Sequence, residues 1–209
     1  MARTDIPRSP GTPGGTLAPG GTPGVLDSLS AIMAENTALL GRVAETADAS
    51  LAAMAARLRG ADRVFVFGAG RSGLALRMTA MRLMHLGLTV HAVGDVTTPA
   101  ITATDALLVA SGSGSTAGVV RAAETAHSAG AAVLALTTAP DSPLAGLADV
   151  TVILPAAQKQ DHGGALSAQY SGALFEQAVM LIGDALFHTL WQASGVTADE
   201  LWPRHANLE

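Results

Sequence analysis

Two short loops rich in glycine and serine, each placed directly after a strongly apolar segment, constrain the fold of this chain more than any other feature. The first loop covers residues 68–73 and follows the apolar run 64–67, and the second covers residues 111–116 and follows the run 106–110. Glycines let backbone N–H groups approach a small anion, hydroxyls donate further hydrogen bonds, and a helix that starts at such a loop adds its positive end. Two such loops at one sheet edge predict a binding site for a phosphorylated small molecule.

The segments around these loops alternate between strand-like and helix-like patterns. Apolar runs predict strands at residues 63–67, 89–93, 105–110, 131–137 and 150–154. Amphipathic segments between them predict helices at residues 72–86 and 116–129, and a short helical turn within 140–147. Strand–helix–strand units at this spacing form parallel strands joined by right-handed crossovers. The predicted fold is therefore an α/β three-layer αβα sandwich, with a five-stranded parallel sheet in the flavodoxin-like order 2-1-3-4-5.

Helical patterns also flank the predicted sheet. Apolar residues recur at spacings of three and four from Val25 to Leu58, which predicts one long or two shorter amphipathic helices. After the fifth strand, residues 156–171 are polar and irregular, and residues 172–193 predict a long helix. A final helical turn is expected at 196–202.

The chain divides into two parts of different composition. Residues 1–21 are rich in proline, glycine and threonine and predict a flexible tail. Residues 22–209 are expected to form a single domain that includes an N-terminal helical arm and a C-terminal tail. The helical arm carries more apolar surface than one small sheet layer requires, and its alanines allow close helix packing. We therefore expect a homo-oligomer, at least a dimer.

The composition excludes several classes of function. The formal net charge is −5 and no basic stripe occurs along the chain, which argues against binding to nucleic acid or to an anionic membrane surface. The absence of cysteine excludes disulfides, thiol catalysis and cysteine-bound zinc, and no histidine pair has metal-site spacing. No apolar run approaches the roughly 20 residues that span a bilayer. These features predict a cytoplasmic protein with neither a metal nor a membrane partner.

The first loop also matches a dinucleotide-binding pattern. Gly68, Gly70 and Gly73 have the required spacing between a strand and a helix, and Asp95 lies near the end of the second predicted strand. A nicotinamide-dependent dehydrogenase is therefore one interpretation, and plain strand-to-helix turns are another. Asp95, however, begins a turn, and a dinucleotide fold has no use for the second, serine-rich loop. A single phosphate held from two sides explains both loops, because strands one and three are neighbours where this topology reverses direction.

Six short motifs between residues 64 and 209 form a set. They are GAGRSG at 68–73, MRLMHLG at 81–87, SGSG at 111–114, PDSPLA at 140–145, LFE at 174–176 and RHANLE at 204–209. Together they resemble the SIS (sugar isomerase) domain and, within it, the 6-phospho-3-hexuloisomerase family. The paired serine loops are similar to the whole superfamily, whereas the MRLMHLG run and the terminal hexapeptide are similar to the isomerase family.

The resemblance implies an isomerase that interconverts D-arabino-hex-3-ulose 6-phosphate and D-fructose 6-phosphate through a cis-enediol, without a metal or redox cofactor. It implies a role beside hexulose-phosphate synthase in the ribulose monophosphate route of formaldehyde assimilation, and a homotetramer with sites at subunit interfaces. Moving the carbonyl from C3 to C2 requires a base that removes the proton on C2 and returns one at C3. One carboxylate set in an apolar wall can perform both transfers.

The same resemblance implies which residues form the site. Glu176 would be the base, and His205 would join an active site, that of a neighbouring subunit. The phosphate would be bound by the two loops, through Gly70, Arg71, Ser72, Ser111, Gly112, Ser113, Gly114, Ser115 and Thr116. Arg71 and His205 are also candidates to donate hydrogen bonds to the enediolate, and His205 is a candidate for ring opening.

Other interpretations exist for single residues and for the whole chain. Glu176 could be a solvated helix position, Arg71 a surface salt-bridge partner, and His205 part of a frayed terminus. His85, among methionines at spacings of three, fits a core or subunit contact, and His162 has no partner in the sequence. Alternative functions are another phosphosugar isomerase of the superfamily, such as arabinose 5-phosphate isomerase, and a non-catalytic sugar-phosphate sensor.

Overall fold

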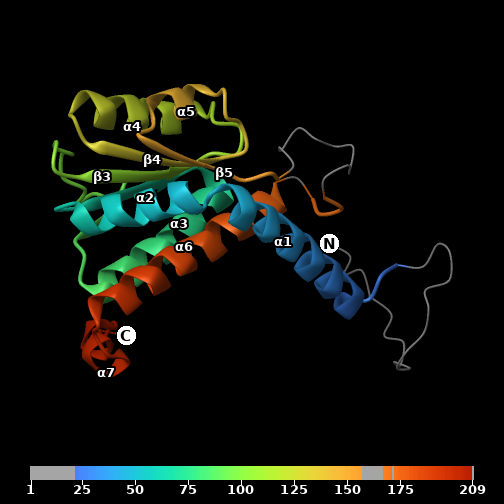
Figure 1. Ribbon diagram of the computed structural model, residues 1–209. Helices are drawn as coiled ribbons and strands as arrows, with labels where there is room; N and C mark the ends of the chain where they lie inside the picture. The colour runs from blue at the N-terminus through green and yellow to red at the C-terminus, as the bar shows by residue number, and fades with distance from the viewer. Residues whose placement is uncertain (1–21, 157–166, 171, 209) are drawn as a thin grey trace, which may run out of the picture.

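The computed structural model describes residues 22–156, 167–170 and 172–208, and it confirms the predicted three-layer architecture (Figure 1). Its sheet has the order β2-β1-β3-β4-β5, and all neighbouring strands are parallel. The strands are β1 (Val64–Gly68), β2 (Val90–Ala92), β3 (Ala106–Ala110), β4 (Ala132–Thr137) and β5 (Val150–Ile153). The predicted strand order is thus correct. The predicted tail 1–21 and His162 lie outside the described residues.

Helices cover both faces of the sheet (Figure 1). One face carries α4 (Ala117–Ser128) and α5 (Pro143–Leu147). The other face carries α2 (Asp48–Gly60), α3 (Gly70–Leu86) and α6 (Ala173–Ser194). A short helix α7 (Ala198–Leu201) and a 3-10 turn η1 (Trp202–Arg204) follow α6 and lead to the C-terminus.

Side chains that alternate along each strand build two cores, one on each face of the sheet. Val64 and Val66 of β1 belong to the larger core, which α1 (Val25–Thr46), α2, α3 and α6 complete. Phe65 belongs to the smaller core, which α4 and α5 cover. The central strand β3 is buried at every position, as its uninterrupted apolar run predicts for a parallel strand covered on both faces.

The N-terminal helical pattern forms two helices. Helix α1 (Val25–Thr46) ends before Ala47, which is buried, and α2 starts at the next residue, Asp48. Helix α1 packs against α6 and extends past the edge of the sheet (Figure 1). Its exposed first turns present the apolar side chains Val25, Leu26, Leu29 and Met33.

Helix α6 corrects one expectation from the sequence. Within the described residues it is the one helix that is long and apolar enough to cross a membrane, with a mean hydropathy of 1.2 over its 18-residue window. The expectation that no apolar run approaches bilayer length is therefore wrong for α6. Half of that window is buried, and α6 packs on α1, α2 and along α3, which is how the core helix of a folded domain packs.

An ion pair joins the chain just before β1 to the chain just before β3. The Arg63 guanidinium donates to both carboxylate oxygens of Asp105, at 2.9 and 2.7 Å. Asp105 also accepts the backbone N–H and the hydroxyl of Thr102, at 2.7 and 2.8 Å. The hydrogen bond from Arg63 is the largest influence on this carboxylate, and with the bonds from Thr102 it holds the pKa of Asp105 below its ordinary value of 3.8.

Candidate active site

The two glycine and serine loops leave the sheet side by side. Strand β1 pairs with β3 as far as Gly68 and Ala110, which are the last residues of the two strands. The loops therefore begin on adjacent strands at the carboxyl edge of the sheet, where the strand order reverses between β1 and β3. A crevice at this position is the usual ligand site of open α/β sheets.

The first loop has its shape because two backbone segments touch. A Cβ atom placed on Gly73 would lie 2.2 Å from the carbonyl oxygen of Gly68, and one placed on Gly68 would lie 2.9 Å from the backbone nitrogen of Gly73. Neither position can hold a side chain without displacing backbone, so the first turn of α3 lies directly against the end of β1. Ser72, in that first turn, is buried. The turn brings the positive end of α3 to the crevice.

The second loop is held together by its own hydroxyl groups. The side-chain oxygens of Ser111 and Thr116 are 3.0 Å apart, and the Ser115 hydroxyl donates to that of Ser113 at 3.1 Å. Thr116 occupies the N-cap position of α4, so this loop also ends at the positive end of a helix. Four of the predicted hydroxyls therefore lie in this loop, and the fifth, Ser72, lies in the first loop.

Thr138 and Ser142, which are not among the predicted site residues, support this second loop. Gly114 has a positive φ of 61°, and a Cβ atom there would lie 2.0 Å from the Ser142 hydroxyl oxygen. Thr138 donates its hydroxyl to the Gly112 carbonyl at 2.8 Å. Ser142 caps α5, whose first residue is Pro143, and this Ser-Pro pair is a recognisable helix-start signal in the sequence.

The start of α6 places Glu176 beside both loops. The Glu176 carboxylate forms an ion pair with the Arg71 guanidinium of the first loop. Next to it, the Phe175 ring packs against the second loop, where a Cβ atom on Gly112 would lie 3.7 Å from the ring. Glu176 is only 4% exposed, whereas the Arg71 side chain is 67% exposed. A buried carboxylate and a solvent-facing cation therefore stand together at the edge of the crevice.

A second glutamate, which sequence reasoning missed, anchors the chain just before α6. Glu35 of α1 accepts hydrogen bonds from the Ser167 hydroxyl, the Ala168 backbone N–H and the Gln169 side chain, at 2.6, 2.8 and 2.9 Å. Burial acts to raise the pKa of Glu35, but these three bonds together outweigh it and hold the pKa below its ordinary value of 4.5. Helix α1 thereby fixes the approach to the helix that carries Glu176.

His205 lies at the other end of the molecule from Glu176. Glu176 is in the first turn of α6, whereas His205 follows η1, beyond the last turn of that helix (Figure 1). The His205 ring stacks on His85 of α3, with ring centroids 4.0 Å apart. One chain therefore does not bring the two predicted catalytic residues together.

The dinucleotide interpretation finds no support in the position of Asp95. The Asp95 carboxylate pairs with Arg77 of α3, at 2.8 Å. The glycine spacing of the first loop is explained by the contact between Gly68 and Gly73. Among the described residues, no group of three or more histidines and acidic side chains is arranged as metal ligands.

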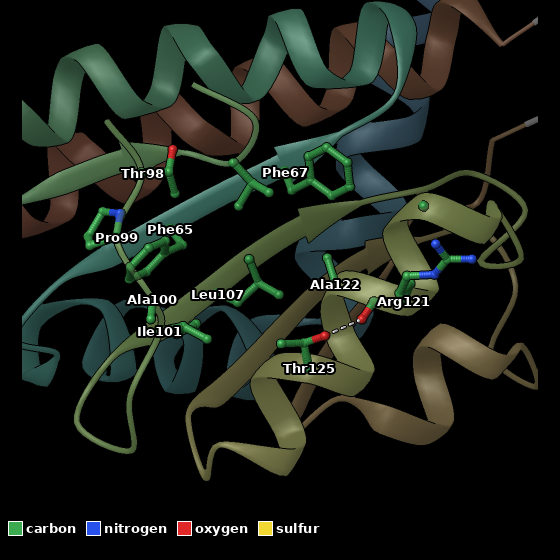
Figure 2. Close-up of a pocket in the computed structure, with 12 residues that line it drawn as sticks. Phe65, Phe67, Thr98, Pro99, Ala100, Ile101, Leu107, Arg121, Ala122 and Thr125 are labelled. Atoms are coloured by element: carbon green, nitrogen blue, oxygen red, sulfur yellow. Dashed lines mark hydrogen bonds between the residues drawn. The ribbon is translucent and has the colours of Figure 1, made fainter. Parts of the chain in front are cut away.

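A pocket on the opposite face of the sheet is too apolar for a phosphosugar (Figure 2). It has a volume of about 370 Å³ and is walled by Phe65, Phe67, Leu107 and Ile101. Figure 2 shows Arg121 extending from α4 away from these rings. The Thr125 hydroxyl at the pocket wall already donates to the Arg121 carbonyl, at 2.9 Å. The two polar loops at the carboxyl edge of the sheet are therefore the better candidate site.

Comparison with known proteins identifies the family of this chain. The family model of the SIS domain matches residues 57–181, which include both loops and Glu176. The 3-hexulose-6-phosphate isomerase of Mycobacterium gastri is 64% identical over 159 residues, which cover 76% of this chain and 80% of the relative. The enzyme of the same name from Bacillus subtilis is 37% identical over 157 residues, covering 75% of this chain and 85% of the relative.

A solved structure shows the same fold. A hypothetical protein from Methanococcus jannaschii, whose structure was described as inferring a molecular function of 3-hexulose-6-phosphate isomerase, aligns with a TM-score of 0.75 and 28% identity. The alignment covers 87% of this chain and 99% of that protein. The chain therefore belongs to the SIS domain family, and named relatives that it matches over most of their length are 3-hexulose-6-phosphate isomerases.

Proposed function

We propose that this protein interconverts D-arabino-hex-3-ulose 6-phosphate and D-fructose 6-phosphate through a cis-enediol. The observation that carries the proposal is the position of Glu176, a buried carboxylate paired with Arg71 of the first loop, next to two hydroxyl-bearing loops that each lead into a helix N-terminus. An isomerase for a phosphorylated ketose needs this combination: a fixed base, and an anion site that sets the position of the sugar carbons relative to it.

In the proposed complex the phosphate lies between the loops after β1 and β3. Ser72, Ser111, Ser113 and Thr116 would donate hydroxyls to it, and the backbone N–H groups of Gly70 and Gly112 would contribute to the same anion site. The N–H groups of Gly114 and Ser115 already donate within the loop, to the Ser111 carbonyl at 3.0 Å and the Ser113 hydroxyl at 3.3 Å, so these two residues would shape the phosphate site. The two loops leave adjacent strands, so both can hold one phosphate group.

Glu176 would then transfer the carbon-bound proton. It removes the proton from C2, which forms the C2–C3 enediol, and returns a proton to C3, while the hydroxyl proton on O2 passes to O3. The Arg71 guanidinium, already in contact with the carboxylate, is the proposed donor to the charge that develops on the oxygens. His205 of a neighbouring copy would serve the sugar oxygens, as donor and in ring opening.

The assembly and setting are part of the proposal. Apolar side chains exposed on α1 and α3 support a homo-oligomer, a dimer or a tetramer, in which sites form between copies. Hexulose-phosphate synthase would supply the substrate in the ribulose monophosphate route, and the cytoplasm is the proposed location. The reaction moves protons only and needs no redox cofactor.

The test follows hydrogen exchange at the reacting carbon. Purified protein is incubated with fructose 6-phosphate in deuterated water, and NMR should show loss of the C3 proton and appearance of the hex-3-ulose phosphate. Glu176→Gln should lower the exchange rate by about 10²–10⁴-fold, the usual contribution of a positioned acid–base group. The matched control is Glu124→Gln, an exposed glutamate on α4, which should exchange at the wild-type rate.

The outcomes separate the candidate functions. Binding of fructose 6-phosphate without exchange would contradict the isomerase and favour a sugar-phosphate sensor. Exchange only with arabinose 5-phosphate would move the protein to another isomerase of the superfamily. Exchange that persists in Glu176→Gln would keep the reaction and reject this carboxylate as its base.

A further inference from the structure

The chain after α7 is anchored on the C-terminal end of α3 by three contacts. The His205 ring stacks on the His85 ring, at 4.0 Å between centroids. The Arg204 guanidinium donates to the backbone carbonyl of His85 at 3.3 Å, and it covers Gly87, where a Cβ atom would lie 3.3 Å from it. Within the same stretch of chain, the Trp202 ring packs against the His205 ring, with centroids 4.6 Å apart. We call residues 202–208 the C-terminal segment.

His85 is an unusual residue for the position that it occupies. It is 4% exposed, and its Nδ1 atom has no hydrogen-bond partner among the described residues. A buried polar atom without a partner is destabilising, so an apolar residue would pack here at lower cost. The contact that an imidazole does make at this position is the stack with His205, which belongs to the C-terminal segment.

The surroundings of His85 favour the uncharged ring. Burial lowers the pKa of His85, and the nearby charges of His205 and Arg82 lower it further. Arg82 lies on α3 itself, over the Phe187 ring of α6, and Arg204 approaches from the C-terminal segment. Burial and the neighbouring positive charge both disfavour a charged His85 ring, so protonation of His85 opposes the stack.

We propose that His85 is a positioning residue. It holds the C-terminal segment against the end of α3, which we call the seated state, and so fixes where the His205 ring is presented to a second copy of the chain. This inference rests on the proposed function in one respect, which is that His205 takes part in the reaction. The seating itself is a property of the single chain and can be measured without substrate.

The sign of the pH dependence follows from the direction of the shift. The seated state holds His85 with a lowered pKa, so the released state binds more protons below the ordinary value of 6.5. Seating is therefore strongest above pH 6.5 and weakens as the pH falls through the seated pKa. His85→Phe keeps a ring for stacking and removes the titration, so its seating should not change over this range.

The experiment measures how fast trypsin cleaves the Arg204–His205 bond of the full-length protein. Mass spectrometry of the intact chain detects the loss of the residues after Arg204. Cleavage is compared from about pH 8 to about pH 5.5, relative to a free peptide with the same terminal sequence. His85→Ala should raise cleavage by about two- to twelvefold at neutral pH, because cleavage follows the population of the released segment and an aromatic stack is lost. Wild-type cleavage should rise below pH 6.5, whereas His85→Phe should stay low and flat.

Kinetics then link seating to the reaction. His85→Ala should lower kcat with KM unchanged, because the phosphate loops are not altered, and His85→Phe should restore kcat. His127→Ala, an exposed histidine at the end of α4, is the matched control and should change neither readout. If His85→Ala does not fold, the comparison of the wild type with His85→Phe across the pH range decides the question.

Two outcomes overturn the inference. The first is a His85→Ala variant whose cleavage rate and kcat equal those of the wild type. The second is a His85→Phe variant that folds normally but still shows the acid-dependent rise in cleavage. A wild-type protein without isomerase activity would instead overturn the proposed function, while the cleavage data would still decide whether His85 seats the segment.

Discussion

At the scale of single residues, the edge of the candidate site depends on positions that exclude a side chain. Gly68 and Gly73 are fixed by the contact between two backbone segments, and Gly114 by its positive φ and its contact with Ser142. Their role in binding is therefore indirect. They allow the end of a strand and the start of a helix to meet, and this close meeting is what brings backbone N–H groups to the crevice.

Substitution of Gly73 tests this close approach. Gly73→Ala should lower the free energy of unfolding by about 2–4 kcal/mol, because the added methyl would lie 2.2 Å from the Gly68 carbonyl oxygen. That oxygen belongs to the last residue of β1 and can move only if the strand moves with it. Urea denaturation measures the loss. Gly41→Ala is the control, since a Cβ there meets nothing within 4 Å in the interior of α1, and it should stabilise by about 0.5–1 kcal/mol. Equal stability of Gly73→Ala and the wild type would show that the loop can relax.

Asp105 gives a prediction on pH dependence. Its pKa is lowered in the folded state, so its contribution to stability is present above the ordinary value of 3.8 and is lost as the pH falls through the folded value. Asp105→Asn should therefore be less stable by about 1–3 kcal/mol at neutral pH, with a difference that shrinks as the pH falls toward 3. Urea unfolding across this range measures it. A difference that is constant with pH would contradict the role given to the charge.

At the scale of elements, the placement of Glu176 depends on how α6 is approached. The chain before α6 is held on α1 by three donors that converge on Glu35, and the side chains of Asn36 and Gln177 join α1 to α6 directly, at 2.6 Å. Helix α1 therefore positions the start of α6.

Glu35→Gln tests this anchoring. It replaces one carboxylate oxygen by an amide group that cannot accept, so hydrogen exchange at the Ala168 amide should become about 5–10-fold faster and kcat should fall. Exchange in the wild type should also accelerate as the pH falls below 4.5, after correction for intrinsic rates, because protonation of a carboxylate with a lowered pKa removes the anchor. Glu45→Gln, on an exposed position of α1, should leave exchange unchanged. Unaltered exchange in Glu35→Gln would contradict the anchoring.

The sequence predicted the regular elements better than the contacts between them. Strand and helix periods are local signals, so every strand bound lies within one residue of its prediction, and the neighbouring loops of β1 and β3 follow from the strand order. The end of α1 before Ala47 has no glycine or proline to mark it. The pair of Arg71 and Glu176 joins residues 105 apart and the bond from Ser167 to Glu35 joins residues 132 apart, so neither leaves a local pattern.

At the scale of the whole molecule, one chain leaves apolar surface that its own fold does not cover. On α3 the exposed side chains Leu74, Met78, Met81 and Met84 recur at spacings of four and three and form one stripe. Such a stripe is typical of a helix that packs against a partner. The sequence predicts that these methionines lie either in the core or at a subunit contact. Because they are exposed in the single chain, the subunit contact is the alternative that remains.

Charged substitutions on this stripe test the assembly. Met78→Glu combined with Met81→Glu should raise the dissociation constant of the homo-oligomer by about 100-fold or more, because two apolar contacts are lost and carboxylates are placed in an apolar interface. Sedimentation velocity measures the species present, and activity should fall with dissociation. The control is Val96→Glu, a fully exposed apolar residue in the loop after β2. A wild-type chain that sediments as a monomer would reject the interface.

Helix α6 also sets a length for any such assembly. Its 22 residues form an unbroken rod of about 33 Å, with the proposed base near one tip and the seated histidine beyond the other. In the proposed complex this rod would separate the base that one copy gives to its own centre from the histidine that the same copy gives to a neighbouring centre. Insertion of a single extra turn would lengthen this separation by about 5 Å in every copy at once, so the length of one helix would set the spacing between neighbouring centres.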